Sequence, residues 1–577
     1  MGLFVSAGDP GTTSRPLRLR RCLALGLLLA GLSGCGWKQP EGSHQNRLVA
    51  TVRREPRTLN RFMSGNPAEN VISLLTQATL VRVDRATGAL APRLAENWRP
   101  EADGLTYTLQ LRKNVLFSDG EPFTAADVIF TFQVLNDPRV GSPMTSSFLI
   151  DGRPIQVVAT DDHTIRLTFP APFGPGLAIL DSLPILPRHK LEAAYAHGAF
   201  AQAWGLSAPP TDIVGLGPFV LAEYVSGQRL RFTRNARFFL QPLPHVDEID
   251  VEIVPEQNAE LLRLTSGQSD LTYDFVRAED VGLLRQAEAQ GRVRLADAGV
   301  DIAPEALWFA LAPGAPHAKD RPWLQREELR QAISYAVDRQ AIVDSVYLGA
   351  AVPIAGPITP GHGEWYAEDA APPVHDLAKA RALLSAIGLI DRDGDGVLED
   401  AQGRPARFSI LTTKGTTVRE RVASVIQDQL HRIGLLVDVV PVETGQLISQ
   451  WGRGDYDAIY YGIHFDAFDP ARNQEFWMSS GSFHLWNPEQ RTPATPWEAR
   501  IDQLMRKQAT TLDPAARRKI FRDVQIIFHD HLPCVYFAAA KATVAMSARL
   551  RGATPSVLQP PLLWNAEALS LDPAARQ

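Results

Sequence analysis

One stretch near the start of the chain has a pattern of apolar and polar residues that predicts a strand, a tight turn and a capped helix. Apolar and polar residues alternate over 105–112, which is the period of two expected for a half-buried strand. Ser118-Asp119-Gly120 then supplies residues that accept tight or left-handed backbone. Thr124, with Asp127 three residues later, can satisfy the free amides of a first helical turn before the apolar run that follows.

Later parts of the chain carry strand-like and helix-like patterns without regular alternation. The runs that predict strands are 228–233, 249–253, 408–412, 435–440 and 458–463. The runs that predict helices, with apolar residues three and four apart, are 377–387, 418–433 and 515–528. No internal repeat or low-complexity block interrupts them, so we expect a globular protein of mixed α and β class.

The front end of the chain predicts a signal peptide. Four arginines between positions 15 and 21 precede the apolar run 23–32, which is about ten residues and too short to span a bilayer of roughly 30 Å. Leu32-Ser33-Gly34-Cys35 has the pattern of a bacterial lipobox, so cleavage would leave Cys35 as a lipidated N-terminus that tethers the protein to a membrane. The alternative is an ordinary signal peptide with a chance cysteine. The polar residues 36–46 suit a tether, and no later apolar run reaches membrane-spanning length.

Length, charge and cysteine content narrow the class further. The chain has 577 residues, which is enough for two or three domains once the signal peptide is removed. Its net charge is −6, and loss of the arginine-rich signal makes the mature chain more acidic still, which argues against nucleic acid as a partner. Of three cysteines, Cys22 leaves with the signal and Cys35 would be acylated, so Cys534 stands alone as a core residue without a disulfide.

Residues 90–132 resemble, almost position by position, the signature of the bacterial extracellular solute-binding proteins of family 5. That family includes the peptide, dipeptide and nickel receptors that feed ABC importers. The resemblance continues, in family order, through 55–60, 215–219, 234–239, 265–270 and 329–339. It therefore covers nearly the whole mature chain.

The resemblance implies a two-lobe periplasmic-binding-protein-like fold of class II, cluster C, with an extra inserted domain. Such receptors close over their ligand by hinge motion, which removes the ligand from water. The expected divisions are a signal peptide at 1–34, a tether at 35–46, lobe I at 47–79, 206–297 and 535–577, an inserted domain at 80–205, and lobe II at 298–534.

The best candidate for ligand chemistry follows the strand predicted at 458–463. In peptide-binding members of the family, an aspartate four residues before a proline pairs with the ammonium of the peptide, and Asp466 stands at that position before Pro470. A desolvated ammonium needs a fixed anion, and a charge-assisted hydrogen bond is worth about 1.5–3 kcal/mol. The alternative is that Asp466 or Asp469 only caps the next turn, and we assign that role to Asp469.

The wall of this site departs from the family, because Ile463 stands where members commonly have tryptophan. The residues that we expect to contact ligand here are Tyr461, Ile463, His464 and Asp466. Tyr461 belongs to a set of aromatic residues that could stack on sugars, although most of the set is expected in the core: Trp308, Trp451, Tyr460, Tyr461 and Trp477.

A peptide also offers a backbone and a carboxylate. Exposed strand edges can read the backbone without regard to side chains. For the carboxylate, Lys414 stands close to where some dipeptide receptors carry a basic residue, with Arg419 and Arg421 as nearby alternatives. A lysine in a loop is also commonly a solvated surface charge.

Metal binding has two sets of candidate residues. Asp391, Asp393 and Asp395 fit the first half of a calcium loop, but position twelve is Gln402 and a predicted strand follows, so a polar turn is the main interpretation. A nickel or haem site would require several histidines to converge, and the candidates are His464, His484, His529 and His531.

Enzyme motifs are absent: the sequence has no G-x-S-x-G elbow, no H-E-x-x-H, no phosphate loop and no dinucleotide fingerprint. We therefore expect a monomeric, cofactor-free receptor outside the cytoplasm that captures short peptides for an ABC permease and its ATPase. The alternatives are a receptor of the same fold for nickel, haem or an oligosaccharide, a hydrolase, or a lipoprotein that binds peptides for sensing or chaperoning.

Overall fold

A four-stranded sheet organises the first part of the protein in the computed structural model, which describes residues 46–463, 465 and 467–572. The predictions for residues 1–45, Cys35 among them, lie outside the described residues. The sheet runs in the order β1 (Arg47–Val52), β12 (Glu248–Ile253), β11 (Arg229–Arg234), β10 (Phe219–Val225). β1 is parallel to β12 and β11 is antiparallel to both of its neighbours. The predicted strands at 228–233 and 249–253 are thus confirmed.

A second, antiparallel sheet lies within the predicted insertion. Its strands are β4 (Ala95–Pro100), β5 (Thr106–Leu111), β9 (Thr164–Thr168) and β8 (Gln156–Asp161), and α2 (Ala125–Asn136) follows the turn after β5. Thr124 and Asp127 form the predicted capping box at the start of α2. Gly120 has a φ of 102°, which is the left-handed backbone predicted for this turn.

β5 differs from the predicted half-buried strand, because its polar face is also covered. Thr106 is 2% exposed and Thr108 is 7% exposed. The hydroxyl of Thr106 donates to Asp103 and lies 3.0 Å from that of Thr168, while Thr108 donates to Glu101. Neighbouring polar side chains therefore cover this face, and hydrogen bonds offset the cost of burying the threonines.

A five-stranded sheet organises the later part of the chain. Its order is β17 (Leu436–Val442), β16 (Arg407–Thr413), β18 (Ala458–Gly462), β14 (Glu305–Phe309), β19 (Cys534–Tyr536). The first three strands are parallel, and β14 is antiparallel to both β18 and β19. Cys534 is fully buried here, as expected.

Helices cover both faces of this sheet. The side chains of β14 therefore enter two separate cores, one on each face. Leu307 and Phe309 belong to one core, whereas Ala306 and Trp308 belong to the other, as the period of two requires. The first core is completed by α6 (Glu327–Ala336), α8 (Leu377–Ala386) and α9 (Thr417–His431). The second is completed by α10 (Thr444–Arg453), α12 (Pro496–Thr510) and α13 (Pro514–His531).

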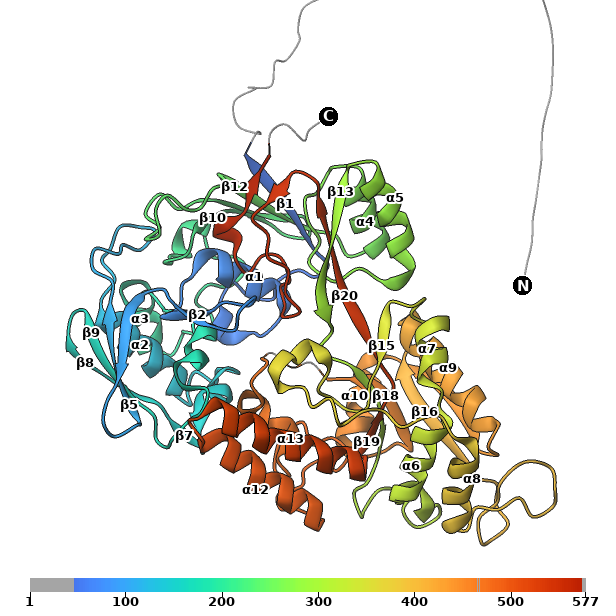
Figure 1. Ribbon diagram of the computed structural model, residues 1–577. Helices are drawn as coiled ribbons and strands as arrows, with labels where there is room; N and C mark the ends of the chain where they lie inside the picture. The colour runs from blue at the N-terminus through green and yellow to red at the C-terminus, as the bar shows by residue number, and fades with distance from the viewer. Residues whose placement is uncertain (1–45, 464, 466, 573–577) are drawn as a thin grey trace, which may run out of the picture. The chain divides into compact units, whose positions relative to one another are not determined.

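A long strand, β20 (Ala538–Ser547), connects the two parts of the fold. Its first residues pair with β15 (Ala351–Pro353) and its later residues pair with β13 (Val293–Val300), as Figure 1 shows in red. The ladder between β13 and β20 shifts register between Asp297 and Val300, just before the chain enters β14. β20, paired with β13, therefore carries the chain between the two sheet-centred parts.

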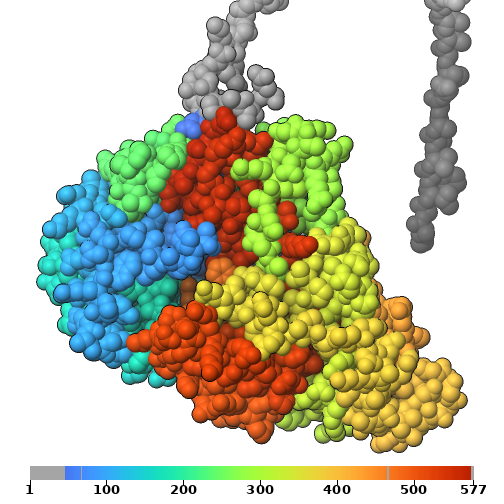
Figure 2. Space-filling model, in the orientation of Figure 1, coloured from blue at the N-terminus to red at the C-terminus, as the bar shows by residue number. Residues whose placement is uncertain are grey.

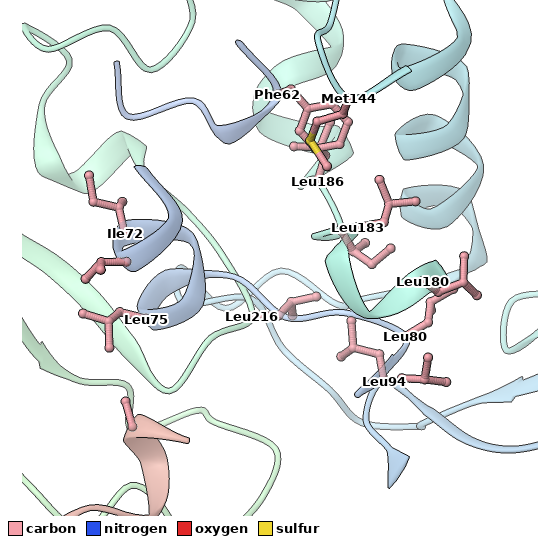
Figure 3. Packing of buried hydrophobic residues seen from close by; sticks show 14 of the residues in the cluster. Phe62, Ile72, Leu75, Leu80, Leu94, Met144, Leu180, Leu183, Leu186 and Leu216 are labelled. Atoms are coloured by element: carbon pink, nitrogen blue, oxygen red, sulfur yellow. The ribbon is translucent and has the colours of Figure 1, made fainter. Parts of the chain in front are cut away.

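One continuous apolar core runs from the first sheet into the predicted insertion. In Figure 3, Ile72 and Leu75 of α1 (Pro67–Thr76) and Leu180 of η3 (Gly176–Ser182) belong to the same cluster of buried side chains. Leu80 and Leu94, which lie in the first residues of the predicted insertion, are 1% and 0% exposed. The insertion is therefore packed onto its host without a break.

The 329–339 motif supplies two buried arginines that bind main-chain carbonyl groups. Arg330 on α6 donates to the carbonyl oxygens of Leu532, Gln325 and His531. Arg339, the first residue of α7 (Arg339–Ser345), donates to Ile354 O at 3.1 Å, Tyr536 O at 3.2 Å and Ser334 O at 2.7 Å. Burial lowers the pKa of Arg339 to about 10.

The remaining regular elements lie around these sheets. They are α3 (Arg188–Ala196), α4 (Gln257–Thr265), α5 (Val281–Ala289), α11 (Gln474–Trp477), β2 (Val81–Val83), β3 (Leu90–Pro92), β6 (Leu149–Ile150), β7 (Arg153–Pro154), β21 (Leu550–Arg551) and β22 (Ser570–Leu571). Among the residues that the structure describes, no helix combines the length and apolar character needed to cross a membrane.

Candidate functional site

The carboxyl ends of the parallel strands β16 and β18 lie side by side, and this is the edge at which open α/β sheets commonly bind ligands. β16 ends at Thr413, directly before Lys414, and β18 ends at Gly462, directly before Ile463. The structure thus brings together the ends of two strands that carry predicted site residues. His464 and Asp466 lie outside the described residues.

Arg419, in the first turn of α9, is the centre of a cluster of charged and aromatic side chains at this edge. Its guanidinium carbon lies 4.2 Å from the centre of the Tyr461 ring, which is cation–π geometry. Its Nε donates to Glu305, and its second nitrogen donates to the Thr413 hydroxyl at 2.9 Å. Arg419 and Glu305 are 17% and 19% exposed at their side chains, so the edge presents a fixed, largely shielded ion pair.

Lys414 occupies a different environment from Arg419. Its side chain is 69% exposed and lies 3.6 Å from the carboxylate of Glu443, which is itself exposed. Arg421 is also exposed. Of the three basic residues considered for a ligand carboxylate, only Arg419 contacts a predicted wall residue, Tyr461, among the residues that the structure describes.

The aromatic residues considered for sugar stacking are mostly core residues, as expected. Trp308, Trp451, Tyr460 and Trp477 are at most 2% exposed. Tyr461 is the half-buried member, with its ring between Arg419 and Trp451. Tyr461 is therefore the aromatic residue of this set that can offer surface to a ligand.

Two described residues of the segment after β18, Phe465 and Ala467, are buried and contact neighbouring residues. Phe465 is 7% exposed, and its ring packs edge-on against Phe476 with centroids 5.3 Å apart. Ala467 is 5% exposed, and its carbonyl accepts a hydrogen bond from Asn473 Nδ2 at 2.9 Å. These contacts hold Phe465 and Ala467 within the first residues after β18.

Asp469 has the capping role that we expected, and it also forms an ion pair. It accepts a hydrogen bond from Ala471 N at 3.0 Å as the N-cap of η8 (Pro470–Asn473). Its two oxygens accept hydrogen bonds from Arg517 at 2.7 and 2.6 Å. Sequence reasoning missed this partner, because Arg517 lies on α13, far along the chain, and no local pattern links the two residues.

The acidic turn between α8 and β16 has the backbone that we predicted for a polar turn. Its carboxylates accept hydrogen bonds from amides of the same turn, for example Asp391 from Gly394 N at 2.7 Å. One carboxylate oxygen from each of four residues lies within 4.8 Å of the other three, and the residues are Asp391, Asp393, Asp395 and Glu399. Glu399, at position nine of the loop, was missed because only the alternate acids at the start of the loop and position twelve were considered in the sequence.

The described histidines do not gather into a metal site. Within the part of the chain that the structure describes, the one group of three or more side chains suited to a metal is the acidic turn, which contains no histidine. His484 instead bonds to Glu498 at 3.1 Å, and His531 bonds to Glu327 at 2.8 Å and stacks on Trp497.

The buried pair of His484 and Glu498 gives a prediction for acid stability. Burial alone would raise the pKa of Glu498, but hydrogen bonds from His484, Trp486 and Thr495 outweigh it and lower the pKa to about 2. Since the unfolded value is near 4.5, the stabilisation is complete above about pH 4.5 and is lost as the pH falls toward 2. Glu498→Gln is expected to cost about 1–3 kcal/mol near pH 7, and the difference from wild type should shrink over that window.

Urea unfolding at a series of pH values from 7 to 3 measures this effect. Glu192→Gln, at an exposed ion pair with Arg188, is the matched control and should differ little from wild type at any pH. A constant difference between Glu498→Gln and wild type across the series would show that the charge of Glu498 is not the cause.

One face of the molecule has a recess. Figure 2 shows a recess between the blue N-terminal residues and the yellow segment near residue 360, with orange atoms at its floor. Two sheet-centred parts connected through β13 and β20, with polar groups at a strand edge, form the architecture of a two-lobe protein.

The family comparison agrees with this class. The model of the bacterial extracellular solute-binding proteins, family 5 Middle, matches residues 89–484. The chain belongs to this family, which groups solute-binding proteins rather than enzymes, and it has the family's two-lobe fold.

Individual relatives are distant but extend over most of the chain. The chain is 26% identical to a probable ABC transporter-binding protein of Deinococcus radiodurans, over 86% of this chain and 87% of the relative. It is also 26% identical to the oligopeptide-binding protein AppA of Bacillus subtilis, over 88% of each. The crystal structure of NikZ from Campylobacter jejuni in complex with Ni(L-His) is similar with a TM-score of 0.74, at 22% identity over 91% of this chain and 100% of that one.

Proposed function

We propose that this protein is the extracytoplasmic substrate-binding component of an ABC importer and that it captures short peptides between its two lobes. The observation that carries the proposal is the anchored segment at the edge of the five-stranded sheet, where buried Phe465 and Ala467 flank position 466. Family membership and the names of the relatives support it, since AppA is an oligopeptide-binding protein and the Deinococcus relative is a probable ABC transporter-binding protein.

In this proposal Asp466 pairs with the ammonium group of the peptide. Tyr461, Ile463 and His464 form the wall beside it, and Ile463 makes that wall less aromatic than in relatives with tryptophan. Lys414, exposed at the end of β16, is the proposed partner of the ligand carboxylate, and it can turn inward because its stem is flexible. A peptide backbone can be held by main-chain hydrogen bonds, which leaves side-chain specificity broad.

The proposed domains are those predicted from the resemblance: lobe I at 47–79, 206–297 and 535–577, the insertion at 80–205, and lobe II at 298–534. The pair of β13 and β20 is the proposed hinge, since it is the ladder that joins the two parts and its register shifts between Asp297 and Val300. Closure about this pair would shield the ligand and give the permease a surface that only the loaded form has.

Location and partners complete the proposal. We propose that Cys35 is lipidated, that residues 36–46 tether the fold to the membrane, and that a monomer delivers ligand to an ABC permease with its ATPase. Mass spectrometry of the N-terminal peptide of the purified protein tests the anchor: an acylated Cys35 is expected, and an unmodified one would contradict it.

Isothermal titration calorimetry with alanine peptides of two to five residues, each free and N-acetylated, tests the function. A buried ammonium–carboxylate bond worth about 1.5–3 kcal/mol predicts that acetylation weakens binding about 10- to 100-fold. Mass spectrometry of molecules that copurify should find peptides. Equal affinity for free and acetylated peptides, recovery of a nickel complex or haem, or hydrolysis of the peptide during titration would each contradict the proposal.

A further inference from the structure

A buried arginine on α13, Arg517, joins three segments that are far apart in the sequence. Its guanidinium group forms the two hydrogen bonds to Asp469, at 2.7 and 2.6 Å, and its Nε donates to the carbonyl of Gln508 at 3.2 Å. Its guanidinium carbon lies 5.1 Å from the centre of the Trp365 ring. The Arg517 side chain is 4% exposed and that of Asp469 is 20% exposed, so the ion pair is largely shielded from water.

A fourth contact to Arg517 comes from the predicted insertion. A Cβ atom added at Gly174 would lie 2.3 Å from Arg517 Nε and 2.6 Å from its guanidinium carbon, which is closer than non-bonded atoms can approach. The backbone of Gly174 is not in the left-handed region, so close approach to Arg517, rather than backbone conformation, requires glycine here. Gly174 N also donates to Ala509 O on α12 at 2.6 Å.

The patch around Gly174 makes few contacts across the two parts of the fold. Arg472 of η8 donates to the Ser182 hydroxyl at 3.1 Å, and Ala471 and Ala509 join the apolar cluster that contains Phe173. A contact of a few hydrogen bonds and small apolar side chains can form and break at low cost. It is therefore suited to a surface that meets when the lobes close, and the structure shows this contact formed.

We propose that Arg517 is a positioning residue for ligand capture, which holds Asp469 and thereby residues 467–473 on one side and receives Gly174 when the lobes close. The inference rests on the proposed function, because it assigns the coupling of closure to the same ligand segment. When Gly174 covers the guanidinium group, water is excluded from the Arg517–Asp469 ion pair and the ion pair becomes stronger. Closure of the lobes and ordering of residues 467–473 then favour each other.

Gly174→Ala tests the coupling, because the added methyl group clashes with Arg517 only where the two segments meet. Gly65→Ala is the matched control, since Gly65 is exposed, has ordinary φ and has no atom within 4 Å of an added Cβ. Hydrogen–deuterium exchange of 465–473 and 171–176, measured without ligand, is the first readout. We expect Gly174→Ala to speed exchange in both segments at least threefold with an unchanged thermal midpoint, and Gly65→Ala to change neither.

Peptide affinity is the second readout, with the alanine peptides used above. We expect Gly174→Ala to weaken binding tenfold or more. Unchanged exchange at 465–473 would overturn the inference, and so would a lower thermal midpoint with unchanged affinity, which is the result of a merely structural contact. If no alanine peptide binds wild type, the proposed function fails, while the exchange measurement still decides the coupling.

A milder variant covers the case in which Gly174→Ala does not fold. Ser182→Ala removes only the hydrogen bond from Arg472 and should raise exchange at 465–473 in the same direction, by a smaller factor. No change at 465–473 in this variant as well would overturn the inference.

Discussion

Replacing Asp466 with alanine is expected to weaken peptide binding by about 2–5 kcal/mol, which is a factor of about 30 to a few thousand in Kd. The reason is that the ammonium of the peptide would still lose its water when the lobes close, but no carboxylate would replace that water. Burying this unpaired charge costs binding free energy. Calorimetry with the free alanine peptides measures the loss. The anchored neighbours Phe465 and Ala467 should keep the backbone in place, so the thermal midpoint of the ligand-free protein should stay the same.

Two controls make this result specific to the charge of Asp466. Asp466→Asn keeps the shape and should lose nearly as much affinity as Asp466→Ala. N-acetylated peptides should bind Asp466→Ala no more weakly than wild type, because neither complex contains the ammonium–carboxylate pair and only wild type would bury an unpaired carboxylate. If Asp466→Ala weakens free and acetylated peptides by the same factor, the aspartate acts on the structure of the site and not on the peptide terminus.

The second large effect is on stability: Arg339→Ala is expected to lower the free energy of unfolding by about 3–5 kcal/mol. The side chain is buried, and its donors satisfy three carbonyl oxygens and the Ser334 hydroxyl. Alanine would leave these acceptors without their donor and create a cavity beside Phe537, over whose ring the guanidinium group lies.

Urea unfolding followed by fluorescence measures the stability of this variant. Arg326→Ala is the matched control, because its ion pair with Glu328 is exposed and should contribute less than about 1 kcal/mol. Arg339→Lys should fall between wild type and Arg339→Ala, since an ammonium group cannot reach all four acceptors. A loss of similar size for Arg326→Ala and Arg339→Ala would mean that burial of Arg339 is not what stabilises the fold.

Local features of this fold could be predicted from sequence because neighbouring residues determine them. The capping box at Thr124 and Asp127, the turn at Gly120 and the N-cap at Asp469 each depend on side chains within a few residues of the backbone groups that they satisfy. The predicted strands and helices also matched β16, β17, β18, α8, α9 and α13 within a few residues, since their apolar periodicity is strong.

Contacts between residues that are far apart in the sequence could not be predicted in the same way. Glu305 meets Arg419 only because β14 pairs antiparallel with β18, which brings the start of one strand to the end of the other. Arg517 meets Asp469 across 48 residues of chain. The predicted basic residue, Lys414, is adjacent in sequence to the strand end, but side-chain direction places Arg419 rather than Lys414 against Tyr461.

The unbroken core between the first sheet and the insertion has a consequence for protein engineering. A fragment comprising residues 80–205 alone would expose apolar surface around Leu80, Leu94 and Leu180, because these side chains share their core with Ile72 and Leu75 of α1. Chimaeras that graft this segment from another family member must therefore transplant α1 with it, or redesign the side chains on both sides of the seam together.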